Sequence, residues 1–92
     1  MQKFPKMEME DNMDEIVFKV PMNEIGIHPQ YLRLRAKGIF DVKIPTRNIA
    51  SVRKNFMGQV EIETSGGKSY KVSLGKFAKD AVAEIDKILY GG

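Results

Sequence analysis

The feature that most constrains this chain is the pattern of residues 76–90, near its C-terminus. The apolar residues there recur at helical spacing: Phe77, Ala81, Val82, Ile85, Ile88 and Leu89. The positions between them are mostly charged: Lys79, Asp80, Glu84, Asp86 and Lys87. This is the 3.6-residue period of a helix that buries one face. Gly91 and Gly92 follow, where glycine commonly ends a helix. The pattern predicts one C-terminal helix that covers a hydrophobic core.

The first strand signal precedes a stretch rich in turn residues. Ile16, Phe18 and Val20 alternate with less apolar positions, which is typical of a half-buried strand, and Pro21 ends it. Residues 22–30 then contain three residues that favour turns: Asn23, Gly26 and Pro29. We therefore expect residues 22–30 to form a connection without a strand of their own.

A hairpin is predicted over residues 31–45. If its loop is Ala36-Lys37-Gly38, glycine takes the third, left-handed loop position, where a side chain would be strained. The cross-strand pairs that follow are Leu34 with Phe40, Leu32 with Val42, Arg33 with Asp41 and Tyr31 with Lys43. In this register the leucines face inward and the arginines outward.

Two more strand segments lead to the helix. Pro45 ends the hairpin, and residues 48–56 form a strand with an irregular start, since Ile49 and Val52 break strict alternation. After a turn at Met57-Gly58, a second hairpin turns around Gly67. Its expected pairs are Val60 with Leu74, Ile62 with Val72, Thr64 with Tyr70 and Glu63 with Lys71.

These segments predict a mainly β fold with one C-terminal α-helix. About six antiparallel strands form two packed sheets, a partly open barrel that the amphipathic helix caps. We expect a single domain over residues 15–92. Residues 1–14, polar and rich in methionine, are expected to be a flexible arm or to dock as an edge strand.

Composition narrows the class of protein. Without cysteine the chain can form neither disulfides nor thiolate metal sites. No apolar run approaches the length of a membrane span, and the N-terminus lacks the apolar core of a secretion signal. We therefore expect a cytoplasmic protein without a transmembrane segment.

Positive charge is concentrated in the middle of the chain. Residues 25–60 hold seven basic side chains and one acidic side chain, Asp41, while residues 1–24 hold three basic and six acidic ones. With Lys19, the candidate ligand-binding cations are Arg33, Arg35, Lys37, Lys43, Arg47, Arg53 and Lys54. They could be solvated strand faces, or they could attract anionic lipid or an acidic protein. Nucleic acid is disfavoured because few exposed aromatics, Tyr31 and Phe56, are available for stacking.

The sequence contains no recognisable catalytic motif. Ser65-Gly66-Gly67-Lys68-Ser69 ends like a phosphate-binding loop, but position 62 is isoleucine where that motif needs glycine, and an alternating strand follows. His28 is the only histidine, which excludes a histidine-cluster metal site. Glu61 and Glu63 share the outward face of a strand and are interpreted as surface ion pairs. We expect no enzyme activity and no cofactor.

The section from Tyr31 to Tyr90 resembles the pleckstrin-homology-like (PH-like) fold, in particular its short bacterial versions. The likeness is carried by Tyr31-Leu32-Arg33-Leu34, by the run from Lys43 to Val52 with its Ile-Pro corner, by the Gly66-Gly67 hairpin and by the helix. The resemblance implies seven strands, one more than the pattern predicts. It also implies that Lys19 and Arg33-Leu34-Arg35 match the basic positions with which lipid-binding members grip phosphoinositide head groups. Bacterial members act mainly in protein interaction and assembly.

The sequence thus favours a non-enzymatic PH-like module for protein interaction or assembly, including self-association. The alternative is peripheral binding to an anionic membrane or a phosphorylated ligand through the basic region 31–54. The residues expected to bind are Lys19, Arg33, Arg35, Lys37, Lys43 and Arg47.

Overall fold

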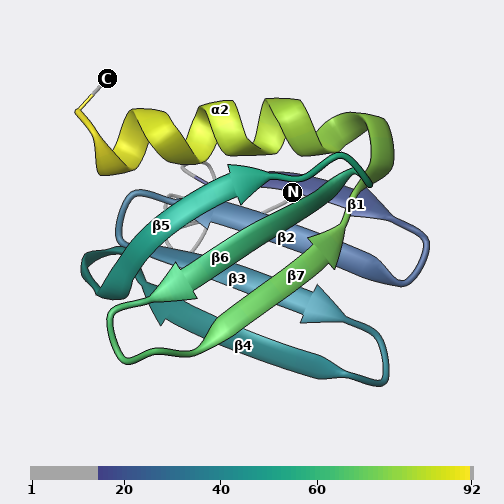
Figure 1. The fold of residues 1–92 in the computed structure, drawn as a ribbon, viewed down its shortest axis with the longest axis horizontal. Coiled ribbons are helices and arrows are strands. Elements are labelled where there is room, and N and C mark those ends of the chain that lie inside the picture. Colours follow the sequence, from purple (N-terminus) through teal and green to yellow (C-terminus); the bar gives the residue numbers. More distant parts are fainter. Residues whose placement is uncertain (1–14, 92) are drawn as a thin grey trace, which may run out of the picture.

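Within residues 15–91, seven strands in chain order form two antiparallel sheets, and one helix follows them (Figure 1). The computed structural model describes residues 15–91, so the arm expected at residues 1–14 lies outside the described residues. The first sheet contains β1 (Ile16–Val20), β2 (Asn23–His28), β3 (Tyr31–Ala36) and β4 (Phe40–Pro45). The 3₁₀ turn η1 (Thr46–Asn48) leads to the second sheet, which contains β5 (Ile49–Lys54), β6 (Gln59–Thr64) and β7 (Ser69–Ser73). A second 3₁₀ turn, η2 (Gly75–Phe77), precedes α2 (Ala78–Leu89).

The two sheets face each other across one hydrophobic core. Their strands cross in Figure 1, and α2 lies along one side of both sheets. The core is built from both inner sheet faces and from the helix: Ile25, Ile27, Leu32, Leu34, Ile44, Val60, Ile62, Val72, Leu74, Ala78, Ala81 and Ile85. Within residues 15–91 no ladder joins the two sheets, so the strands form no closed barrel. The predicted mainly β fold with two packed sheets and one C-terminal helix is confirmed.

The prediction of a strandless connection at residues 22–30 is wrong, because β2 occupies most of it. Ile25 and Ile27 are fully buried, and Gly26 lies between them in the strand. A Cβ at Gly26 would come within 2.7 Å of the Glu15 carboxylate and 3.0 Å of the Arg33 guanidinium. This glycine therefore gives room to an ion pair that crosses the strand, and it is not a turn residue.

Both hairpins are shifted by two residues from the predicted register. In the first, Ala36 pairs with Phe40, Leu34 with Val42, Leu32 with Ile44 and Arg33 with Lys43. Gly38, with φ of 80°, therefore occupies the middle of the turn and not its third position. In the second, Val60 pairs with Val72, Ile62 with Tyr70 and Glu61, in place of Glu63, with Lys71. A shift of two residues keeps every side chain on its face, so the inward and outward assignments hold.

The irregular start of the strand after Pro45 is confirmed. The register of β5 against β6 shifts between Ile49 and Ser51, as in a β-bulge. The helix is shorter than residues 76–90, because Gly75–Phe77 form the 3₁₀ turn η2. Phe77 remains 37% exposed beside the Phe18 ring, with the two centroids 6.5 Å apart.

The helix should stabilise the domain through its buried stripe. We expect Ile85→Ala, at a fully buried position, to lower the free energy of unfolding by about 2–5 kcal/mol through lost burial and a cavity. Lys79→Ala, on the exposed face of α2, should change it by less than about 0.5 kcal/mol. Urea denaturation followed by circular dichroism measures both. Equal small effects would show that the helix is not part of the core.

Candidate functional site

Cations and carboxylates alternate across the outer face of the first sheet. Lys19 of β1 lies opposite Glu24 of β2, and Glu24 lies opposite Arg35 of β3. Arg35 in turn lies opposite Asp41 of β4, with 3.9 Å between the Arg35 Nε and an Asp41 oxygen. The basic face predicted from the sequence is therefore partly neutralised by acidic residues on neighbouring strands.

Arg33 is held by two carboxylates in the middle of this face. Its guanidinium lies 3.2 Å from Glu15 and 3.2 Å from Glu24, whose side chains are only 11% and 13% exposed. The hydrogen bond to Glu15, with the charges of Glu15 and Glu24, raises the pKa of Arg33 above its ordinary value. This pairing offsets the repulsion expected from Lys43, which lies directly opposite on β4. Arg33 thus stabilises the sheet, and its charge is already matched inside the protein.

Lys43 contacts an aromatic stack at the start of β3, where Tyr31 lies. Its ammonium lies 4.4 Å from the centre of the Tyr31 ring, and the His28 ring is stacked on Tyr31 with 4.5 Å between centroids. The Tyr31 hydroxyl donates to Glu15 at 3.4 Å. The two rings and Lys43 form a compact group on the sheet surface, separate from the row of Lys19 and Arg35.

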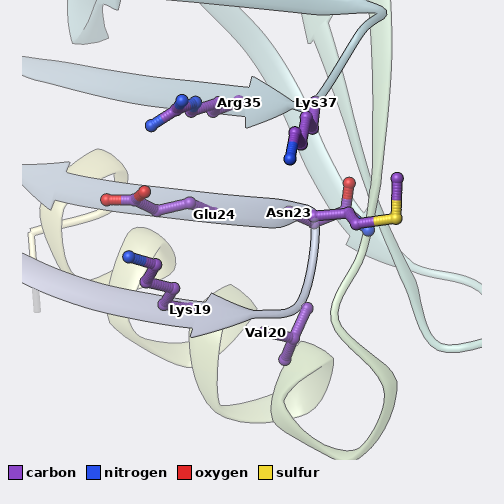
Figure 2. A pocket seen from close by; sticks show the side chains of 7 residues that line it. Lys19, Val20, Asn23, Glu24, Arg35 and Lys37 are labelled. Atoms are coloured by element: carbon purple, nitrogen blue, oxygen red, sulfur yellow. The ribbon is translucent and has the colours of Figure 1, made fainter.

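Three of the predicted cations come together at one end of the sheet. Lys19 of β1, Arg35 of β3 and Lys37 of the β3–β4 turn line a hollow of about 170 Å³, together with Val20, Met22, Asn23 and Glu24. Figure 2 shows the Glu24 carboxylate between Lys19 and Arg35, with the Lys37 ammonium nearer Asn23. The lining residues carry three positive charges and one negative charge, and Glu24 is already paired with Arg33. We call this hollow the cationic pocket.

The other predicted cations lie elsewhere. Arg47 is in η1, at the opposite end of the strands, where Thr46 donates a backbone hydrogen bond to Gln30. Arg53 lies on the second sheet and is paired with Glu61 at 2.8 Å. The structure therefore divides the predicted cations into three groups. Lys19, Arg35 and Lys37 line the cationic pocket, Arg33 is paired with two carboxylates in the middle of the sheet, and Arg47 and Arg53 lie apart from both.

The β5–β6 turn presents two apolar side chains to solvent. Phe56 is 95% exposed and Met57 is 66% exposed. The Asn55 side chain accepts hydrogen bonds from the backbone N–H groups of Met57 and Gln59, and donates to the side chains of Gln59 and Glu61. From the other side, the Gly58 carbonyl accepts from the backbone of Leu74 and Gly75, each at 3.0 Å. The turn is thus fixed by polar contacts that do not involve the Phe56 and Met57 side chains.

Glu61 is part of this turn scaffold. Hydrogen bonds donated by Asn55 and Arg53 hold the pKa of Glu61 below its ordinary value. The carboxylate is therefore ionised at neutral pH and remains an acceptor for Asn55. Its stabilising contribution is complete above its pKa in the unfolded chain and is lost as the pH falls through the lower folded value.

Three hairpin turns lie together at one end of the molecule, on the right in Figure 1. Lys37 of the β3–β4 turn donates to the Met22 carbonyl of the β1–β2 turn at 2.7 Å. The Asn23 side chain donates to the Ser73 carbonyl, and the next residue, Leu74, donates to Gly58 of the β5–β6 turn. We call this the turn end: residues 21–22, 37–39 and 55–58 with the cationic pocket.

The turns of the turn end carry exposed apolar side chains, which the turns of the opposite end lack. Its tips are Met22 at 65%, Ile39 at 78%, Phe56 at 95% and Met57 at 66% exposure. The turns at the opposite end are residues 29–30, 46–48 and 65–68, and they contain no large apolar side chain. The sequence does contain a signal for this site, because an apolar residue within a turn is expected to be exposed. The sequence alone does not show that the three turns meet.

The β5–β6 turn depends on glycine for space as well as for conformation. Gly58 and Gly38 both have positive φ, of 75° and 80°. A Cβ at Gly58 would lie 3.0 Å from the Gly75 backbone, whereas nothing lies within 4 Å of one at Gly38. We expect Gly38→Ala to cost about 1–2 kcal/mol of backbone strain and Gly58→Ala to cost more. Thermal denaturation of the pair tests this, and equal losses would contradict it.

Comparisons with protein-family models, with curated proteins and with solved structures give no match. Within residues 15–91, no helix combines the length and hydrophobicity that crossing a membrane requires. In the same residues, histidine, aspartate and glutamate side chains form no group of three that could hold a metal ion.

Proposed function

We propose that this chain is a non-enzymatic PH-like interaction module that binds its partner through the turn end. The order of elements supports this assignment: four antiparallel strands, then three, then a C-terminal helix. The strand missed in the sequence, β2, brings the number of strands to the seven that the PH-like resemblance implies. In Figure 1 the connections β2–β3, β4–β5 and β6–β7 lie at the opposite end of the strands from the three turns of the turn end.

The ligand chemistry that fits the cationic pocket is phosphate. Lysine and arginine together supply point charges and a planar guanidinium, which is the usual chemistry of phosphate recognition. Lys19, Arg35 and Lys37 reach the hollow from two strands and one turn. Glu24 between them is paired with Arg33, and Arg35 also faces Asp41 at 3.9 Å. This convergence is the observation that carries the proposal. The phosphate can belong to a lipid head group or to a phosphorylated soluble ligand.

Removing cations from the pocket should weaken binding to anionic vesicles. Each lysine near an anionic surface contributes about 1 kcal/mol, so the double variant Lys19→Ala/Lys37→Ala should bind about thirtyfold more weakly. Sedimentation with vesicles that contain phosphatidylserine measures the affinity, and titration with inositol hexakisphosphate tests a soluble phosphate. Binding should also fall as salt rises, because exposed charges are screened.

The matched control removes the same charge from the opposite end. Arg47 lies in η1 and Lys68 in the β6–β7 turn, and these two segments are joined by a backbone hydrogen bond from Ser65 to Asn48. Arg47→Ala/Lys68→Ala should therefore bind like the unaltered protein apart from a small effect of net charge. Equal losses of vesicle affinity in both double variants would show that binding follows net charge alone and would refute the cationic pocket as the binding site.

Association of two copies along β1 is a second candidate function. β1 is an edge strand of the first sheet, and its Ile16 and Val17 are 43% and 45% exposed. Edge strands offer unpaired backbone groups to another chain. We expect light scattering to give a mass that rises with concentration, and Val17→Lys to abolish the rise. A constant monomer mass over the concentration range would exclude this candidate.

A further inference from the structure

We propose that the Phe56-Met57 pair is a membrane-inserting prong, and that the partner of the turn end is the surface of an anionic bilayer. This inference rests on the proposed function, since it names the surface that carries the phosphates. It adds a second sheet to the site, because the prong belongs to the β5–β6 turn and the cationic pocket to the first sheet.

Hydrogen bonds within the protein hold the prong without any partner. Four hydrogen bonds of the Asn55 side chain and two to the Gly58 carbonyl fix the turn from both sides. A turn that is already ordered loses little conformational entropy when it binds. Phe56 is 95% exposed in this ordered state, so nearly all of its apolar surface remains available for burial.

The pattern of charge around the prong fits a bilayer better than a protein groove. The four apolar tips are divided among three turns, and Met22 lines the same hollow as Lys19, Arg35 and Lys37. Lys54 precedes the turn, with its ammonium 3.4 Å from the Asn55 carbonyl, and Lys76 follows Gly75, whose backbone N–H donates to the Gly58 carbonyl. Apolar tips between cations match a layer of anionic head groups above hydrocarbon.

A single tryptophan can report insertion directly. The chain has no tryptophan, so Phe56→Trp introduces a unique fluorophore at the prong and Tyr90→Trp a matched one at the end of α2. Tyr90 is 69% exposed and caps the C-terminal end of α2, which lies away from the turn end in Figure 1. With vesicles of phosphatidylcholine and phosphatidylserine, the emission of the Phe56→Trp variant should shift to the blue and be quenched by lipids brominated on their acyl chains. The emission of the Tyr90→Trp variant should stay unchanged.

The outcomes separate the prong from the proposed function. If the Phe56→Trp variant sediments with vesicles while its emission is neither shifted nor quenched, the prong is refuted and phosphate binding by the pocket stands. If only inositol hexakisphosphate binds, the bilayer is refuted as the partner. If neither vesicles nor the soluble phosphate binds, the proposed function falls as well. A blue shift that requires an added protein and no lipid would assign the prong to a protein partner and refute the bilayer.

A second variant tests the energetic role of the prong without a fluorophore. Phe56→Ser/Met57→Ser removes the apolar surface and leaves Asn55 and Gly58 in place. Vesicle affinity should fall by about tenfold or more, while the thermal unfolding temperature stays within a few degrees because neither side chain is packed. Unchanged vesicle affinity with an unchanged unfolding temperature would overturn the proposal.

Discussion

The structure depends on burying the inner faces of two sheets that do not close on each other. Four strands and three strands leave an opening, and α2 fills it with Ala78, Ala81 and Ile85. The two alanines are small enough for the helix backbone to approach the sheets, and Ile85 is fully buried in the core. The apolar side chains of the inner faces are buried in this one core, so the side chains of the outer faces and of the turns are exposed to solvent.

That division explains why the basic region of the sequence is not one binding face. The outer face of the first sheet must hold its cations on adjacent strands, and like charges placed opposite each other destabilise a sheet. Glu15 and Glu24 offset the repulsion between Arg33 and Lys43 by pairing with Arg33. Gly26 has no side chain, which leaves space for the contact between Glu15 and Arg33. At the edge of this network, Lys19 and Lys37 are left around a hollow. Attraction for anions is therefore concentrated at the end of the sheet and is weak at its centre.

Apolar alternation predicts the faces of the strands well, and it predicts their boundaries and register less well. Ile16, Phe18 and Val20, or Leu32 and Leu34, are recognised because every second residue is large and apolar. β2 is missed because Asn23 and Gly26 favour turns in isolation, and the reason for Gly26 is an ion pair between residues 15 and 33. The register depends on the length of each turn. A shift of two residues keeps apolar side chains opposite apolar ones, so the apolar pattern does not distinguish the two registers. The candidate site is the part that the sequence predicts least, because its residues come from three turns that only the tertiary structure brings together.

The exposed side chains of the turn end are not demanded by the fold. Met22 has φ of 75° because it is the second residue of the two-residue β1–β2 turn after Pro21, but this backbone does not call for an apolar side chain, and the Met22 side chain is 65% exposed. Asn55 and Gly58 would hold the β5–β6 turn whatever residues stood at positions 56 and 57. Apolar groups in water at three turns favour aggregation and add nothing to the core. Under the proposed function, an anionic partner would cover these side chains, and the cations of the cationic pocket would attract it.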